Sequence, residues 1–429
     1  MPFIHFDEAK QAAIDSVRTW TDAQQPDVRA LLIVDLLGKL RLVLWPAGEP
    51  DTTGLEQGLA TKCGAWWTGE LLRVAELDAV TLRVYEAAWD AAPVDADETR
   101  LRVHDRHRSR TAWFSKPVEP PWKAPAMGPP LIVFYSFKGG LGRSTLLASF
   151  AIQRARMGER VCVVDFDLDS PGAGRLLSAD AAGLTAHWGV VDFLLEQSVA
   201  EAPLVDYFHR CDRAAGAGEI VVFPAGKMDQ EYADKLARID LEEAPDAHDG
   251  GLWKLLTRVR DELKPNWILL DARTGISEPA GQLLSGIAHL HVLLGTTQDQ
   301  SWQGLNLVLD RLGRRRLMAD LAQAEVSLVQ ALVPSGEPGS SARTTFSARS
   351  EQQFDDLYYA EEDGGDQDSC WTLGDKGSQD APHVPMPVDY DSKLASFVDI
   401  TEVADVLCSG AYPAIAERIA SRFLVEPEA

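Results

Sequence analysis

A short glycine-rich stretch between two apolar segments constrains the fold of this chain more than any other feature. The run Leu131–Phe134 has the composition of a buried strand, and Leu146–Gln153 has that of a helix. Between them lies the sequence KGGLGRST, residues 138–145. Glycines at a helix N-terminus let backbone N–H groups approach an anion, and the helix dipole adds partial positive charge. The stretch therefore predicts a phosphate-binding loop with a nucleoside triphosphate as its ligand.

The loop departs from the strict pattern G-x-x-x-x-G-K-[ST] at two positions. Phe137 stands where the first glycine is expected, and Arg143 stands where the lysine is expected, whereas Gly142 and Ser144 keep their places. The remaining residues resemble the deviant P-loop of ParA/MinD-type ATPases of the SIMIBI class, in which a second lysine stands at the position of Lys138. Within that family the arginine makes the loop similar to the KGGVGR-motif variant group.

Two acidic strand ends follow the loop in the order that this resemblance implies. Val161–Asp165 is a predicted strand about twenty residues after the loop, as a βαβ unit requires, and it continues into Asp167. Trp267–Asp271 is a second apolar run that ends in an acid. Because the carboxyl ends of parallel strands lie at the ligand edge of a sheet, we expect these acids near the phosphates.

The resemblance implies catalytic roles for three residues. Asp167 matches the acid that positions the attacking water, and Lys138 matches the lysine that reaches the nucleotide bound to the other subunit of a dimer. Arg143 replaces the lysine that contacts the β- and γ-phosphates. A guanidinium is planar and bidentate, whereas an ammonium is a compact charge. We therefore expect nucleotide binding to persist and hydrolysis to be slow or stimulated by a partner.

The expected cofactors are ATP and Mg²⁺, although the sequence does not distinguish ATP from GTP. Mg²⁺ prefers oxygen ligands, and the resemblance implies that Ser144, Asp165 and Asp271 bind it. Arg273 is expected either to contact the γ-phosphate or to pair with a neighbouring acid. The base is expected at the end of the run Val326–Val333. The residues expected to bind the nucleotide are Gly139, Gly140, Leu141, Gly142, Arg143, Ser144, Thr145, Val333 and Pro334.

The first part of the chain, residues 1–115, is predicted to be a small α/β domain of unknown role. A helix over 8–22 is expected to be capped by Asp7, and the runs 30–35 and 40–45 are expected to form a hairpin. The six tryptophans of this part are expected to fill its core. It carries no recognisable catalytic group.

The second part of the chain, residues 131–429, is predicted to be a ParA/MinD-like ATPase domain. Its strands alternate with helices, which predicts a mostly parallel sheet flanked by helices. Six prolines between positions 117 and 130 predict a stiff, extended linker over 116–130. An insertion at about 340–382, rich in acids and glycines, is expected to be a mobile loop.

Composition limits the partners of the chain. A net charge of −24 disfavours nucleic acid, because neutralising phosphates needs a basic surface. Two arginine clusters, 100–110 and 311–316, are expected to pair with acids at the surface; the alternative is a docking patch for nucleic acid or an acidic partner. No apolar run reaches the length of a membrane span, and the five cysteines form no C-x-x-C motif. We expect a cytoplasmic protein without membrane contact.

The function that these features favour is a nucleotide-dependent switch. ATP–Mg²⁺ would form a homodimer that controls a protein partner, and the variant group implies a bacterial conflict or signalling system. Two alternatives remain open. A DNA-partition ATPase would need a basic dimer surface, and a non-hydrolysing adaptor would bind nucleotide without turnover because of Arg143.

Overall fold

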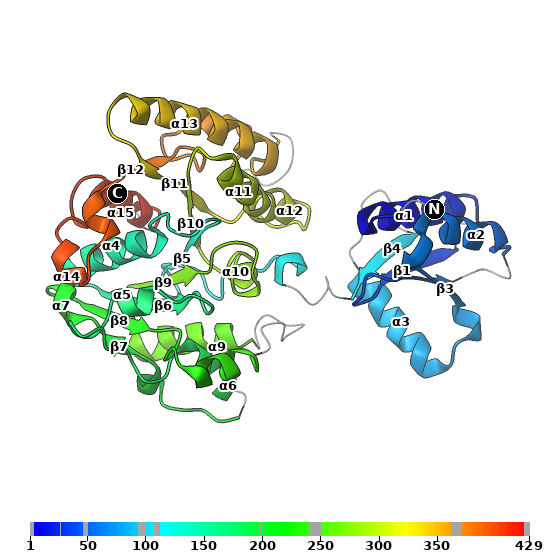
Figure 1. The fold of residues 1–429 in the computed structure, drawn as a ribbon, viewed down its shortest axis with the longest axis horizontal. Helices are drawn as coiled ribbons and strands as arrows, with labels where there is room; N and C mark the ends of the chain where they lie inside the picture. Colours follow the sequence, from blue (N-terminus) through cyan, green and yellow to red (C-terminus); the bar gives the residue numbers. More distant parts are fainter. Residues whose placement is uncertain are drawn as a thin grey trace. The chain divides into compact units, whose positions relative to one another are not determined.

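The chain forms two compact units, residues 1–115 and 116–429 (Figure 1), and each is described by itself. The computed structural model describes residues 4–25, 27–45, 50–92, 100–106, 112–197, 199–239, 250–361 and 370–423. None of the described helices has the length and apolar character that crossing a bilayer requires.

The first unit is a four-stranded sheet in the order β3-β2-β1-β4. β1 is antiparallel to β2, as the predicted hairpin requires, and parallel to β4, while β3 is parallel to β2. The bounds of its elements are α1 Phe6–Asp22, β1 Arg29–Val34, β2 Leu40–Trp45, α2 Thr53–Cys63, η1 Gly64–Trp66, β3 Trp67–Arg73, η2 Val74–Glu76, α3 Ala79–Ala91, β4 Leu101–Asp105 and η4 Ala112–Phe114.

Helices cover both faces of this sheet. Alternate strand residues such as Leu32 and Leu42 pack against α1 and α2, whereas Ile33 and Val43 pack against α3. The alternation follows from the strand period of two. The predicted first helix differs at its start: α1 begins at Phe6 with His5 as its N-cap, so Asp7 lies in the first turn. The strand β3 was not predicted, because its residues are mostly exposed or half-buried.

The second unit is built on an eight-stranded sheet in the order β12-β11-β10-β5-β9-β6-β8-β7. All neighbouring strands are parallel except β7, which is antiparallel to β8. The predicted fold class, a mostly parallel sheet flanked by helices beside a small α/β unit, is therefore confirmed. The strands are β5 Leu131–Ser136, β6 Arg160–Phe166, β7 His209–Arg210, β8 Glu219–Phe223, β9 Trp267–Ala272, β10 Leu290–Gly295, β11 Val326–Val333 and β12 Met386–Asp389.

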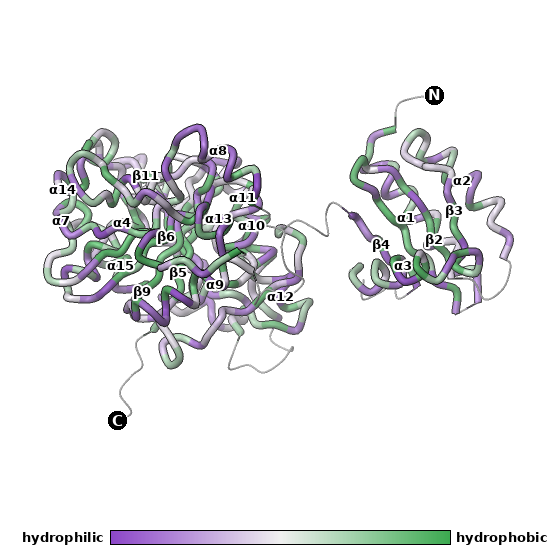
Figure 2. Tube along the Cα trace, turned by 90° about the horizontal axis from the view of Figure 1, so that it is seen from below, coloured by the Kyte–Doolittle hydropathy of each residue, from purple (hydrophilic) through white to green (hydrophobic). Residues whose placement is uncertain are grey.

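The central strands of this sheet are buried on both faces. Every residue of β5, β9 and β10 is buried, and Figure 2 shows the hydrophobic trace of β5 enclosed within the unit. One face packs against α4, α7, α14 and α15. The helices are α4 Arg143–Arg156, α5 Ala173–Leu176, α6 Val190–Glu196, η5 Leu204–Tyr207, α7 Asp212–Ala215, α8 Gln230–Leu236, α9 Gly251–Arg258, η7 Val259–Leu263, α10 Glu278–Leu283, α11 Asp299–Leu312, α12 Arg314–Leu317, α13 Glu337–Leu357, η8 Leu373–Gly377, η9 Ser392–Ala395, α14 Ile400–Val403 and α15 Tyr412–Ser421.

Both edge strands of the large sheet are short. β7 has two residues, and β12 has four, one of which is Pro387. A proline has no N–H to donate to a neighbouring strand. Because these strands are parallel, the carboxyl ends of β5, β6, β9, β10 and β11 lie on the same side of the sheet. The loops that follow them meet there, and we call this side the carboxyl-terminal edge.

The proline-rich segment 116–130, for which we expected a stiff, extended linker, is hydrogen-bonded to other residues of the second unit. Val118 donates its N–H to the Ser285 carbonyl at 3.0 Å. Trp122 is 5 % exposed, and its indole donates to the Pro129 carbonyl at 2.8 Å. Prolines therefore give this segment an irregular path without preventing its packing.

The second arginine cluster differs from the solvated face that we expected. Arg311 and Arg316 are each 4 % exposed. Their guanidinium groups donate to backbone carbonyls, such as Arg311 Nε to Leu284 at 2.9 Å and Arg316 Nε to Ala322 at 2.7 Å. These two arginines are therefore part of the interior and cannot form a docking patch. In the first cluster, Arg108 and Arg110 lie outside the described residues.

The insertion at 340–382 is partly helical. Its first half belongs to α13, which runs from Glu337 to Leu357. Tyr358 is fully buried, and Trp371 donates its indole N–H to Glu325 at 2.8 Å, so these rings anchor the segment. Residues 362–369, which carry most of the predicted acidic loop, lie outside the described part of the chain.

Candidate functional site

The predicted phosphate loop connects β5 to the N-terminus of α4 and is open to solvent. Gly140 and Gly142 have φ values of 77° and 81°, and Gly142 is the N-cap of α4. A Cβ atom added at Gly139, Gly140 or Gly142 would meet no atom within 4 Å. The first N–H groups of a helix have no partner within the helix. The loop therefore leaves space for an anion in front of free donors, while the side chain of Leu141 anchors it in the core.

Phe137, the first departure from the P-loop pattern, packs against α11. A Cβ atom at Gly304 would lie 1.9 Å from Cγ of Phe137. Glycine at 304 is therefore what gives the ring its space, and the start of the loop is fixed by this packing instead of by a glycine turn.

Arg143, the second departure, turns toward the acids at the carboxyl ends of β6 and β9. Its Nε donates to Asp271 Oδ1 at 2.6 Å, and its Nη2 donates to Asp167 Oδ2 at 2.9 Å. Ser144 Oγ donates to Asp271 Oδ2 at 2.7 Å. The guanidinium is 7 % exposed, and its Nη1 atom is buried with no hydrogen-bond partner. The structure thus brings together four of the predicted residues and leaves one donor of Arg143 unused.

Burial of these charges shapes their pKa values. Burial by itself disfavours the Arg143 cation, but the Asp271 and Asp167 carboxylates outweigh it, so the pKa of Arg143 is raised. Asp165 is fully buried and makes no ion pair with Arg143; burial first, and the Asp271 carboxylate second, raise its pKa to about 8. A cation arriving near Asp165 would oppose this shift, because it stabilises the ionised carboxylate.

Residues 165–172, which begin with the last two residues of β6, are named here the first switch segment. Asp165 Oδ2 accepts the Gly174 N–H at 2.9 Å, which fixes the turn that leads to α5. Asp167 Oδ1 accepts the N–H and the hydroxyl of Ser170, both at 3.2 Å. Both oxygens of Asp167 therefore have partners, since Oδ2 accepts from Arg143.

Residues 271–277, which begin with the last two residues of β9, are named the second switch segment. Arg273 forms an ion pair with Asp169 at 2.6 Å and lies 3.7 Å from Asp167 Oδ1. In this structure the arginine therefore pairs with neighbouring acids, one of the two roles expected for it. The Gly275 carbonyl accepts the Tyr135 hydroxyl at 3.1 Å, which connects this segment to β5.

Lys138 and the predicted base-binding residues lie at the same edge but outside the Arg143 cluster. Lys138 Nζ donates to Gln298 Oε1 at 2.9 Å, so the loop after β10 also reaches the phosphate loop. Gln298 was not among the predicted site residues, although its place after an apolar strand was a signal that could have found it. Val333 and Pro334 lie at the end of β11, where Tyr390 donates its N–H to the Val333 carbonyl at 2.9 Å. Their role toward a base stays a prediction.

The residues present fit a triphosphate with Mg²⁺. The open glycine loop and the unused Nη1 of Arg143 are donors for anionic oxygens. The hydroxyl of Ser144 and the carboxylate of Asp271 are oxygen ligands of the kind that Mg²⁺ prefers. Within the described residues no group of three or more His, Cys, Asp or Glu side chains is arranged to hold a metal ion.

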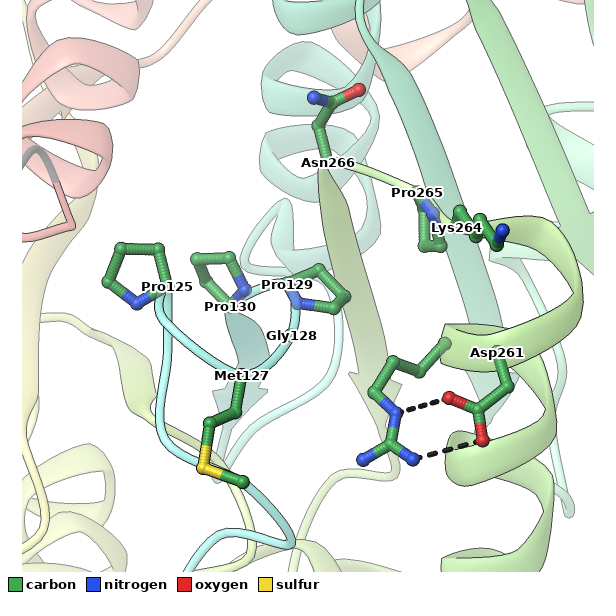
Figure 3. A pocket seen from close by; sticks show the side chains of 10 residues that line it. Pro125, Met127, Gly128, Pro129, Pro130, Asp261, Lys264, Pro265 and Asn266 are labelled. Atoms are coloured by element: carbon green, nitrogen blue, oxygen red, sulfur yellow. Dashed lines mark hydrogen bonds and ion pairs between the residues drawn. The ribbon is translucent and has the colours of Figure 1, made fainter.

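A hollow of about 520 Å³ lies at the amino-terminal ends of the strands, on the side of the sheet opposite the phosphate loop. Figure 3 shows its walls, where Pro129 and Pro130 precede β5 and Pro265 precedes β9. Two of its three charged residues, Arg260 and Asp261, form an ion pair with each other at 2.6 Å, and the third is Lys264. The hollow therefore lies before the strands, whereas the loop and the acids lie after them.

The chain is similar in structure to partition and cell-division ATPases. ParA of pNOB8, solved bound to nonspecific DNA, is 16 % identical, and the match covers 68 % of this chain and 98 % of that chain at a TM-score of 0.44. A putative plasmid partition protein from Borrelia burgdorferi B31 bound to AMPPNP is 12 % identical, with 68 % and 99 % covered and a TM-score of 0.45. The cell division ATPase MinD of Pyrococcus furiosus is 20 % identical, with 47 % and 71 % covered and a TM-score of 0.34.

ParA and MinD proteins, the family that the motifs predicted, are thus among the solved structures that this chain resembles. The identities are low, so the similarity concerns the fold. No family model and no curated protein matches the sequence.

Proposed function

We propose that this chain is an ATP-dependent dimerisation switch that binds ATP with Mg²⁺, hydrolyses it slowly and controls a partner protein. One observation carries the proposal: Arg143 and Ser144, at the start of α4, meet Asp167 and Asp271 from two neighbouring strands beside an open glycine loop. A phosphate loop, a hydroxyl and two strand-end acids are the parts that phosphoryl transfer requires.

Arg143 would change partners when the triphosphate binds. Its Nη1 is already unpaired, and the phosphates offer a larger negative charge than two carboxylates. Asp167 would then be released to orient a water molecule. When bound, Mg²⁺ would be held by Ser144, Asp271 and Asp165, and would supply charge neutralisation at the phosphates. Lys138, which is half-buried at the front of the loop, would leave Gln298 and reach the nucleotide of the second subunit.

A non-hydrolysing adaptor is the second candidate, and the state of Asp167 favours it. Both oxygens of this carboxylate accept hydrogen bonds, from Arg143 and from Ser170. If Arg143 stays on Asp167 after nucleotide binds, the acid cannot act on water. The two candidates differ in one measurable quantity, the release of inorganic phosphate from bound ATP.

A role in DNA partition has weaker support. The net charge is −24, and two arginines of the second cluster are buried. A bacterial conflict or signalling system is the setting that we propose for the partner, with the first unit as the adaptor.

The experiment combines binding and mass measurements on the full chain. Calorimetry with ATP, ADP and GTP, each with and without Mg²⁺, tests the site itself. Light scattering after size exclusion should find a dimer with ATP–Mg²⁺, trapped in Asp167→Ala and absent in Lys138→Ala. Lys62→Ala, which changes an exposed lysine of the first unit, is the matched control. Absence of nucleotide binding to folded protein would overturn the proposal.

A further inference from the structure

The chain segment that connects the first unit to the second is hydrogen-bonded to the residues just after α10, the helix that follows the second switch segment. α10 begins directly after Ser277, whose hydroxyl accepts the Ala280 N–H at 3.4 Å. A helix of six residues is about 9 Å long and moves as one piece. A displacement of residues 271–277 therefore reaches the carboxyl end of α10.

The carboxyl end of α10 is held by buried side chains. A helix ends with carbonyls that lack partners within the helix. Here His291 lies 3.3 Å from the Leu283 carbonyl, and Arg311 donates to the Leu284 carbonyl at 2.9 Å. Arg316 lies 3.4 Å from the Ser285 carbonyl. This end of α10 is thus fixed to β10, α11 and α12.

Val118 makes hydrogen bonds to this region through both its N–H and its carbonyl. We name the arrangement the Val118 junction, and it consists of Val118, Ser285, Gly286 and Arg316. The Val118 N–H donates to Ser285 at 3.0 Å, and its carbonyl accepts from Arg316 Nη1 at 2.6 Å. Gly286 has φ of 102°, and a Cβ there would lie 2.1 Å from Arg316 Nη1 and 2.5 Å from the Val118 carbonyl oxygen. The junction is close-packed, so a movement of α10 cannot leave Val118 unaffected.

The segment stays fixed beyond the junction. His289 Nδ1 accepts the Leu131 N–H at 2.9 Å, so its Nε2 carries the proton and donates to the Trp122 carbonyl at 2.6 Å. The Arg260 guanidinium lies 4.9 Å from the centre of the Trp122 ring. Between the phosphate loop and the first unit, the chain is thus attached at Trp122 and at Val118, and Val118 is only three residues after Ser115.

We propose that the Val118 junction transmits the nucleotide state of the second switch segment to the chain entering the first unit, with Arg316 as its positioning residue. The inference rests on the proposed function, since a nucleotide is the natural trigger. Phosphates that draw Arg273 from Asp169 displace residues 271–277 and α10, and the bond between the Val118 N–H and Ser285 lengthens. The first unit then receives the signal through its own connecting chain.

Hydrogen exchange of the full chain tests this coupling at the Val118 amide. In wild type, ATP–Mg²⁺ should speed exchange of the peptide containing Val118 on the order of 5- to 100-fold. In Arg316→Met this exchange should be fast with and without nucleotide, while calorimetry should show that the variant still binds nucleotide. Arg314→Met, which changes an exposed neighbour, should behave as wild type. Arg316→Lys, which keeps a hydrogen-bond donor, should retain part of the nucleotide-dependent change in exchange at Val118. This variant replaces Arg316→Met in the test if Arg316→Met does not fold.

A second arm separates failure of the coupling from failure of the function. Arg273→Ala breaks the ion pair with Asp169 without any nucleotide, and it should also speed exchange at Val118. If nucleotide binds and alters exchange in residues 271–277 but not at Val118, the coupling is overturned while the switch stands. If no nucleotide binds, the proposed function fails, and an unchanged Val118 exchange in Arg273→Ala overturns the coupling as well.

Discussion

Arg273 and Asp169 form an ion pair at 2.6 Å that joins the two switch segments. The pair lacks the alignment of a hydrogen bond, and the Arg273 Nη1 atom makes no hydrogen bond. The Asp169 carboxylate is exposed, so solvent weakens this contact and an incoming phosphate can compete for the guanidinium.

Replacing Asp169 by Asn should therefore favour ATP over ADP. The variant frees Arg273 for the γ-phosphate, which ADP lacks, so we expect the ratio of the ATP and ADP affinities to rise about threefold to tenfold. Calorimetry with both nucleotides measures the ratio, and an unchanged ratio would exclude Arg273 as a γ-phosphate contact.

Removing the guanidinium of Arg143 should destabilise the nucleotide-free protein. Arg143→Met leaves the buried carboxylates of Asp167 and Asp271 without their cation, and such losses are about 3 kcal/mol. Arg273→Met, at a side chain that is 29 % exposed, is the control and should cost less than about 1 kcal/mol. Urea denaturation compares the two; equal losses would contradict the buried cluster.

A methyl group at position 304 should disturb the phosphate loop. Gly304→Ala places a carbon 1.9 Å from the Phe137 ring, which must move together with Lys138 beside it. We expect a stability loss of about 1–3 kcal/mol and weaker nucleotide binding. Phe137→Ala in the same chain should restore most of the binding, because the collision is removed. Fluorescent nucleotide titrations of the single and double variants provide the test.

Acid should weaken the fold through His291. This side chain is fully buried, and burial lowers its pKa to about 4, below the usual 6.5. Above pH 6.5 the group is neutral in both states, so its full contribution is present. Between pH 6.5 and 4 the unfolded chain takes up a proton that the folded protein does not, so stability falls by up to about 3 kcal/mol. His291→Gln should have a shallower loss of unfolding free energy over this range in denaturation series; an identical slope would exclude His291 as the cause.

Apolar runs and their acidic ends made the large sheet predictable. Trp267–Asp271 and Val326–Val333 are strands because residues of this composition must be buried on both faces of a parallel sheet. The direction of Arg143 was not predictable, because its partner Asp271 is 128 residues away and a rotamer decides the contact. The burial of Arg316 was not predictable either. The carbonyls that accept hydrogen bonds from its guanidinium belong to chain segments that only the tertiary fold brings together.

The two short edge strands of the large sheet limit how a second copy of this chain can bind to that sheet. A second molecule finds few unpaired backbone groups on the two residues of β7, and beside β12 it meets Pro387. Extending the sheet from one molecule to the next is thus disfavoured. We therefore expect the second unit to associate with another copy through side chains and loop backbone, which is the kind of contact that a bound anion is able to create or abolish.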